Sequence, residues 1–161
     1  MNNLTGKRAI LYRRVSTTEQ KDTGSSLSSQ KEHLTSFCIR NDIKIIKDYE
    51  EDFSAKNFNR PEFSKLIEYA AKNKNNIDLV LFNKWDRFSR NALLGMTIVH
   101  QLRGMDIDVN SSEEWIDHDD PSQQLLYMIH MGLPEIDNRI RSGRTITGTR
   151  RNLKDGRWVH S

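Results

Sequence analysis

The chain is constrained most by a regular alternation of short apolar runs with longer stretches of helical periodicity. Short segments of strand length that are rich in apolar residues occupy residues 8–15, 43–46, 79–82 and 107–109. Between them, apolar residues recur every three or four positions, which indicates helices near residues 26–40, 61–70 and 94–102. Strands that alternate with helices favour a mostly parallel sheet covered on both faces. We therefore expect a three-layer α/β fold of four to five strands, with the candidate fifth strand at Glu114 to Ile116.

The C-terminal part of the chain has a different pattern. From Pro121 onward, an apolar stripe at helical spacing predicts one long helix. The stripe consists of Leu125, Ile129, Leu133, Ile136 and Ile140. Pro134 lies within it and is expected to kink or restart the helix. We accordingly divide the chain into an α/β domain over residues 1–120 and a long helix over residues 121–161.

Charge is unevenly distributed along the chain. The net charge is only +3, but residues 139–161 hold seven Lys or Arg and a single acidic residue, Asp155. A basic segment attached to a nearly neutral domain is typical of a nucleic-acid contact. We expect double-stranded DNA as the partner, with Arg144, Arg150, Arg151 and Lys154 as DNA-binding residues. The alternative is a solvated helix end whose cations suit the helix dipole.

Composition limits the cellular context and the cofactors. No apolar run approaches the roughly 18 residues of a membrane helix, and the first residues lack a signal-peptide core. We expect a cytoplasmic protein with no membrane partner. Cys38 is the only cysteine, which excludes an internal disulfide and any multi-cysteine metal site. Its place on an apolar helical face predicts a packing role.

Two arginine-bearing segments follow two of the predicted strands. Arg14 and Ser16 stand at the end of the first strand, and residues 84–90 follow the strand at 79–82. The carboxyl ends of parallel strands meet at one edge of the sheet, where α/β proteins bind ligands. This placement predicts a common crevice lined by Ser16, Arg14, Lys84, Asp86, Arg87 and Arg90.

Such a crevice suits a phosphodiester. Attack of a serine on phosphorus places negative charge on the non-bridging oxygens, and fixed guanidinium groups stabilise that charge. None of the five histidines lies in either segment, so a Ser-His-Asp triad is poorly supported.

An ordered set of three motifs resembles the catalytic domain of the serine recombinases, the resolvase and invertase superfamily. The motifs are Tyr12-x-Arg14-Val15-Ser16-Thr17-x-x-Gln20, then Ser26-Leu27-x-x-Gln30, then Asp86-Arg87-Phe88-x-Arg90. The resemblance implies a resolvase-like, flavodoxin-like sheet followed by a long helix that dimerises and then contacts DNA. It also implies cleavage of both DNA strands through a 5′-phosphoserine intermediate and rejoining within a homodimer and tetramer on DNA. Neither a metal nor a nucleotide cofactor is implied.

The resemblance assigns roles residue by residue. It makes Ser16 the nucleophile and matches Arg14 to the arginine that contacts the scissile phosphate. Arg87 and Arg90 match the pair of arginines that flank the active site after the second strand. It implies that Asp86 orients Arg14 or Arg87, or helps to protonate the leaving 3′ oxygen.

Four further positions complete the predicted catalytic set. Arg60 resembles the arginine that a mobile loop brings to the phosphate, and Lys84 matches a position that is often basic in the family. Gln20 matches a family glutamine near the active site, although a loop glutamine is commonly just solvated. Tyr12 belongs to the first motif, although a strand tyrosine commonly packs in the core.

Three alternatives to an active recombinase remain open. A catalytically idle recombinase relative would act in DNA binding or assembly, and a flavodoxin-like regulator would bind a phosphate group. A metal-dependent nuclease would need paired carboxylates, for which Asp117, Asp119 and Asp120 are candidates, although helix capping explains them equally well. Longer family members continue beyond the C-terminal segment, so we expect further DNA-binding domains downstream.

Overall fold

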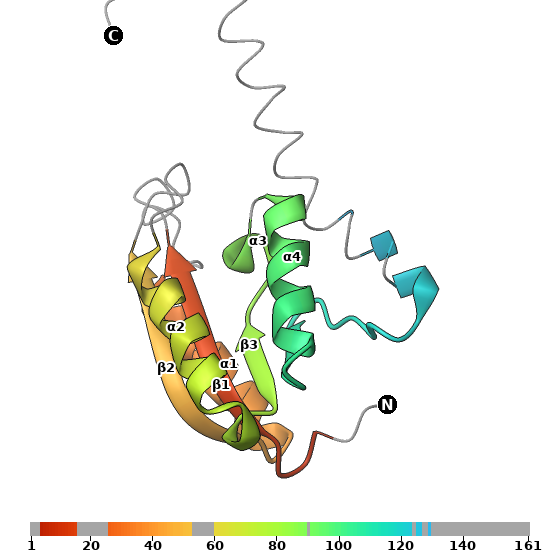
Figure 1. Cartoon of the computed structure of the whole chain (residues 1–161). Helices are drawn as coiled ribbons and strands as arrows, with labels where there is room; N and C mark the ends of the chain where they lie inside the picture. Colours follow the sequence, from red (N-terminus) through yellow and green to blue (C-terminus); the bar gives the residue numbers. More distant parts are fainter. Residues whose placement is uncertain are drawn as a thin grey trace, which may run out of the picture.

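The computed structural model describes residues 4–15, 26–52, 60–89, 91–123, 125, 126 and 129. Strands and helices alternate along it, as the periodicity predicts (Figure 1). The elements are β1 (Arg8–Val15), α1 (Leu27–Arg40), β2 (Lys44–Asp52), α2 (Pro61–Lys72), the 3-10 turn η1 (Lys74–Asn76), β3 (Leu79–Phe82), α3 (Trp85–Phe88), α4 (Ala92–Arg103) and β4 (Asp108–Ser111).

The four strands form one parallel sheet in the order β2-β1-β3-β4. The predicted parallel α/β sheet is therefore confirmed. The chain passes from β1 to β2 on one side and then returns to place β3 on the other side of β1. Ligands of open α/β sheets bind outside the strand ends at such a reversal. The candidate ligand site thus lies beyond the carboxyl ends of β1 and β3.

The expected fifth strand at Glu114 to Ile116 is wrong, because these residues form no strand. The Asn110 side chain bonds both backbone polar groups of Ile116, at 2.9 Å to its N–H and 2.7 Å to its carbonyl. The Ser111 hydroxyl oxygen accepts the N–H of Glu114 at 3.0 Å. These side chains occupy the backbone groups that a strand ladder would need.

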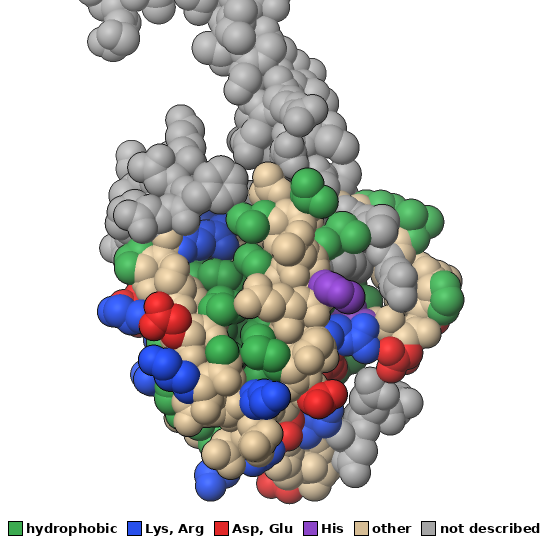
Figure 2. Space-filling model, in the orientation of Figure 1, with side chains coloured by type: hydrophobic (Ala, Val, Ile, Leu, Met, Phe, Trp, Pro, Cys, Tyr) green, Lys and Arg blue, Asp and Glu red, His purple; other side chains and the backbone are tan. Residues whose placement is uncertain are grey.

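Helices cover the two faces of the sheet, with α2 and α4 on one face and α1 on the other (Figure 1). Alternate residues of each strand enter different cores, as strand geometry requires. Tyr12 and Phe82 pack with α2 and α4, whereas Leu11 and Leu81 pack with α1 and Cys38. Figure 2 shows hydrophobic side chains along the seam between α2 and α4, with Lys or Arg side chains at its upper end.

The chain leaves the sheet through a capped helix start at Pro121. The Asp120 carboxylate accepts the Ser122 N–H at 2.9 Å, which is helix capping with proline at the first helical position. Most of residues 121–161, including Pro134 and the basic segment, lies outside the described residues, so the long helix and the domain division stay predictions. None of the helices in the described part combines the length and hydrophobicity that a bilayer crossing requires.

Candidate active site

Arg14 joins the end of β1 to the short helix α3. Its side chain is 1% exposed, and its guanidinium donates to the carbonyl oxygens of Asp86 at 2.6 Å and Arg87 at 2.9 Å. Neither acceptor carries a formal charge, and the two bonds fix the orientation of the guanidinium. The end of β1 and the helix that follows β3 are therefore held together by one buried cation.

Strand parity determines which of the adjacent arginines faces this site. Arg14 lies on the same face as Tyr12, whereas Arg13 points to the opposite face. There Arg13 bonds the Asp48 carboxylate at 2.9 and 2.7 Å and also lies 2.9 Å from the carboxylate of Glu50. Arg13 is thus a structural ion-pair residue.

Arg60 reaches the same short helix from the start of α2. It donates to the carbonyl oxygen of Phe88 at 2.6 Å, and its guanidinium carbon lies 5.8 Å from the centre of the Phe63 ring. The carbonyls of residues 86–88 belong to the last turn of a helix and have no partner within it. Arg14 and Arg60 bind three consecutive carbonyls of this kind, and they converge on α3 for that reason.

Arg87 belongs to α3 itself. Its side chain is 12% exposed and lies 3.4 Å from the carboxylate of Asp86, which is 29% exposed. Among the described residues, the Asp86 Oδ1 atom is buried without a hydrogen-bond partner. Among the described residues, three arginines and the Asp86 carboxylate therefore lie on or around a single turn of helix.

Tyr12 packs beneath the arginines. Its ring is fully buried and meets Phe63 edge to face, with ring centres 5.0 Å apart. Burial raises the pKa of Tyr12 to about 12, and the nearby guanidinium groups of Arg60 and Arg14 offset part of the rise. The phenol therefore stays neutral at physiological pH. Tyr12 therefore belongs to the hydrophobic core and also lies beneath the arginines of the site.

Lys84 is engaged away from the arginines. Its ammonium lies 3.3 Å from the carboxylate of Glu113, which also lies 4.0 Å from His33 on α1. This lysine is half exposed. The structure thus brings together Tyr12, Arg14, Arg60, Asp86 and Arg87, while Lys84 pairs on the side of the sheet that α1 covers.

Two supporting residues hold the backbone of this site. Gln30 of α1 accepts the Arg14 N–H at 3.2 Å and donates to the Arg14 carbonyl at 3.0 Å. Pairing of β1 with β3 stops at Leu11, so Gln30 replaces the missing strand partner at that point. Glu51 of β2 accepts the N–H groups of Glu62 and Phe63 at 3.0 and 3.1 Å, and thereby caps α2 next to Arg60.

These supporting roles differ in how far the sequence reveals them. Gln30 belongs to a motif and can be expected to support the site. Glu51 was missed, because its role depends on the register that places it beside Arg14 across β1 and β2.

Ser16, Gln20 and Arg90 lie outside the described residues, as do Arg144, Arg150, Arg151 and Lys154. Their roles stay predictions. Val15, the last residue of β1, is buried directly before Ser16. Ser89 precedes Arg90, and its hydroxyl donates to the Asn91 carbonyl at 2.8 Å.

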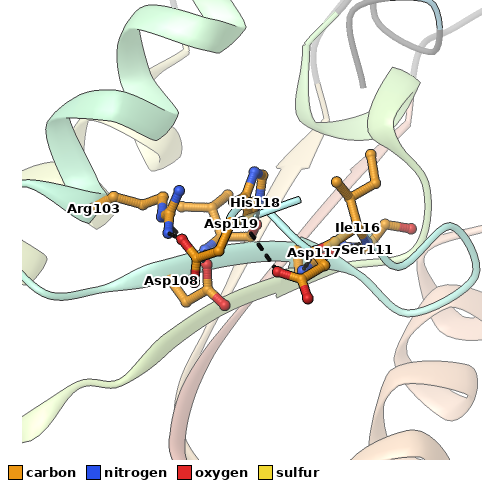
Figure 3. Close-up of polar contacts among 9 residues, drawn as sticks. Arg103, Asp108, Ser111, Ile116, Asp117, His118 and Asp119 are labelled. Atoms are coloured by element: carbon orange, nitrogen blue, oxygen red, sulfur yellow. Dashed lines mark hydrogen bonds and ion pairs between the residues drawn. The ribbon is translucent and has the colours of Figure 1, made fainter. Parts of the chain in front are cut away.

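The three aspartates considered for a metal site have separate partners. Asp119 lies 2.8 Å from Arg103, and the Asp117 carboxylate accepts the Asp119 N–H at 3.0 Å (Figure 3). Asp120 caps the helix at Pro121, as the capping explanation predicts. In the described ranges no group of three His, Cys, Asp or Glu side chains could hold a metal ion.

Comparison with known proteins identifies the family. The Resolvase N-terminal domain matches residues 9–158. The chain belongs to this family. The resemblance to serine recombinases based on the three motifs is thereby confirmed.

Relatives of known sequence extend the comparison. A Bacillus subtilis (strain 168) protein named "Putative DNA recombinase" is 30% identical over 147 residues, which is 91% of this chain and 28% of that protein. "Uncharacterized immunity region protein 3" of Bacillus phage phi105 is 39% identical over 70 residues, which is 43% of this chain and 85% of that protein. The chain thus spans less than a third of the Bacillus subtilis relative.

Solved structures show the same architecture. The N-terminal catalytic domain of TP901-1 integrase has a TM-score of 0.64 at 26% identity, covering 83% of this chain and 98% of that one. A resolvase family site-specific recombinase from Streptococcus pneumoniae has a TM-score of 0.61 at 26% identity, covering 92% and 99%. The resolvase-like fold is therefore confirmed.

Proposed function

We propose that this domain cuts and rejoins DNA in site-specific recombination, with Ser16 as the nucleophile. In the cleavage step the Ser16 oxygen forms a bond to phosphorus, the bond from phosphorus to the 3′ oxygen breaks, and the serine proton leaves for a base or solvent. The leaving 3′ oxygen takes up a proton from an acid or from solvent, so that the products are a 5′-phosphoserine link and a free 3′ hydroxyl. Rejoining reverses these bond changes with a new 3′ hydroxyl.

One observation carries this proposal. Arg14 from β1, Arg60 from α2 and Arg87 from α3 meet at one turn of helix, beside the strand end that leads into Ser16. Three cations on separate elements repel one another, so their clustering favours an anionic ligand. A phosphodiester in a five-coordinate transition state suits guanidinium donors, which bind its oxygens in pairs.

The neighbouring groups fit the same chemistry. Tyr12 stays neutral and adds no negative charge beside the phosphate. Asp86 lies within 3.4 Å of Arg87 and is suited to orienting it, or to exchanging a proton with the leaving 3′ oxygen. The guanidinium groups supply the positive charge that metal ions supply in two-metal nucleases, so we propose cleavage without a metal or a nucleotide.

Double-stranded DNA is the proposed substrate and the basic segment its second contact. Arg144, Arg150, Arg151 and Lys154 would bind backbone phosphates, which position a protein without selecting a sequence. Target choice would then depend on other parts of the protein or on the assembly. We further propose a homodimer that pairs into a tetramer on DNA, since recombination requires two sites and four strand cuts.

Trapping the covalent intermediate tests the proposal. The full-length protein is incubated with genomic DNA of its source organism, and the reaction is stopped with detergent. DNA retained on a protein-binding filter is sequenced to identify the site, and the modified peptide is mapped by mass spectrometry. We expect a phosphoserine link at Ser16 that forms equally well with EDTA present. Ser16→Ala should abolish it while DNA binding persists.

Two comparisons make the outcome specific. Ser89→Ala should keep the adduct, because the Ser89 side chain is buried and its hydroxyl is committed to Asn91. Arg87→Ala should slow adduct formation on the order of a hundredfold or more, as loss of one preorganised donor does in other anionic transition states. An adduct that survives in Ser16→Ala, or that appears only with added magnesium, would contradict the proposal. An absent adduct with intact DNA binding would favour the idle relative.

A further inference from the structure

The short helix α3 is held at its beginning by a residue that follows β4. Glu114 accepts the backbone N–H of Trp85 with its carboxylate at 3.0 Å. Its carbonyl oxygen accepts the indole N–H of the same residue, also at 3.0 Å. Lys84, at the N-cap position, makes no side-chain capping bond, so the cap comes from a residue 29 positions away in sequence.

Trp85 is the point of attachment for this contact. Its side chain is fully buried, and its ring meets Phe82 and Phe88 edge to face at centre distances of 4.9 and 6.1 Å. It also meets the His118 ring edge to face at 5.9 Å. Trp85 thus fixes the rotation of α3 within the core while Glu114 fixes its first N–H group.

Glu114 is itself attached to the sheet. The Ser111 hydroxyl accepts the Glu114 N–H at 3.0 Å and donates to the Asn83 carbonyl. Asn110 holds both backbone groups of Ile116. The segment after β4 is therefore a rigid support, and it connects α3 to the helix that begins at Pro121.

The two ends of α3 have complementary partners. Glu114 holds the first N–H, and Arg14 and Arg60 bind the carbonyls of the last turn. A turn of four residues cannot move at one end without moving at the other. A shift of its N-terminal end would displace the carbonyls that orient Arg14 and Arg60, and it would displace Arg87 directly.

We propose that Glu114 is a positioning residue for the arginine site, acting through α3. The inference rests on the proposed function, because it assigns Glu114 to the cleavage step. It gives the root of the C-terminal helix a physical connection to the arginines. A displacement of the segment after β4 would shift α3 and thereby move the arginines that are proposed to bind the phosphate.

Single-turnover cleavage on saturating DNA tests the assignment. Glu114→Ala should slow adduct formation on the order of tenfold with DNA affinity unchanged, since removal of a helix cap shifts a local equilibrium by about that factor. Glu114→Gln keeps an acceptor oxygen and should recover most of the rate. In combination with Arg60→Ala, the loss should be smaller than the product of the two single losses, because both act through α3.

Asp78→Ala is the matched control. Asp78 also holds a backbone N–H, that of Arg8 at 2.7 Å, but it lies at the opposite edge of the sheet. The substitution Asp78→Ala should lower the thermal stability of the protein. It should not slow cleavage at temperatures where the variant is folded. Equal slowing by Asp78→Ala would show that only general destabilisation is measured and would overturn the assignment.

Hydrogen exchange separates this inference from the function it rests on. Glu114→Ala should increase amide exchange over residues 85–89, whether or not the protein cleaves DNA. Unchanged exchange, or a wild-type rate of adduct formation in Glu114→Ala, overturns the role of Glu114 and leaves Ser16 chemistry intact. An adduct that persists in Ser16→Ala instead overturns Ser16 as the nucleophile, whereas the exchange result over residues 85–89 still shows whether Glu114 holds α3.

Discussion

Gln30 offers a quantitative test of how the site is built. Its side chain is 4% exposed and makes two hydrogen bonds to the backbone of Arg14, two residues before Ser16. Gln30→Leu keeps a similar volume and removes both bonds, so that a buried N–H and a buried carbonyl lose their partner. Each such loss costs about 1–3 kcal/mol, or roughly 2–6 kcal/mol together. For a chain of this size that corresponds to a fall in melting temperature of roughly 5 to 20 °C.

Gln30→Glu adds a pH dependence whose sign follows from the same two bonds. An ionised carboxylate can accept the Arg14 N–H but repels the Arg14 carbonyl, whereas a protonated carboxyl can satisfy both groups. Its pKa in the folded protein should therefore lie above the ordinary glutamate value of about 4.3. The stabilisation is then fully present below that value and is lost as pH rises through the folded pKa.

Thermal unfolding between pH 4 and pH 8 measures both effects. Relative to the wild type, Gln30→Glu should be closest in stability at the acidic end, and Gln30→Leu should be less stable throughout. Gln101→Leu, at an exposed position of α4, controls for the substitution itself and should change little. A melting temperature for Gln30→Leu within about 1 °C of the wild type, well below the smallest shift expected from two lost bonds, would refute the reasoning.

Two further predictions follow from buried titratable groups. The pKa of Tyr12 is raised to about 12 in the folded protein, whereas an unfolded tyrosine ionises near about 10. The free energy of unfolding should therefore fall as pH rises from about 10. In an absorbance titration, one tyrosine should ionise only with unfolding, and Tyr12→Phe should remove that step. Burial raises the pKa of Cys38 to about 11. A thiol reagent at pH 8 should label it at the rate of global unfolding, and rapid labelling of the folded protein would contradict this packing.

The fold could be predicted because its signal is periodic and local. Each strand of the sheet overlaps a short segment rich in apolar residues, and each long helix overlaps a stretch in which apolar residues recur every three or four positions. The prediction of a fifth strand at Glu114 to Ile116 was wrong for a physical reason. Trp115 and Ile116 have strand-forming side chains, but Asn110 and Ser111 occupy the backbone groups of the segment. Propensity alone does not show which groups a distant side chain will take.

The sequence predicted which of the described residues lie together at the site better than it predicted the contacts that hold them. Motif spacing placed Arg14, Asp86 and Arg87 at one edge of the sheet, and the structure brings them together. It did not show that residues 85–88 form a turn of helix, because four residues are too few for periodicity to appear. Unless that turn of helix is known, the sequence gives no reason to expect supporting roles for Glu51 and Glu114.

The manner in which the arginines are held bears on the proposed cleavage step. An arginine paired with a carboxylate would be oriented, but its charge would be largely cancelled before a phosphate arrived. Arg13 has that arrangement with Asp48 and Glu50. Arg14 and Arg60 are instead oriented by the carbonyl oxygens of α3, which carry no net charge. Adjacent arginines of one strand thus have different partners, because strand alternation directs Arg13 to Asp48 and Glu50 on one face and Arg14 to the carbonyl oxygens of α3 on the other. Donors fixed in place before the charge develops are what an anionic transition state requires, since no reorganisation is then needed as it forms.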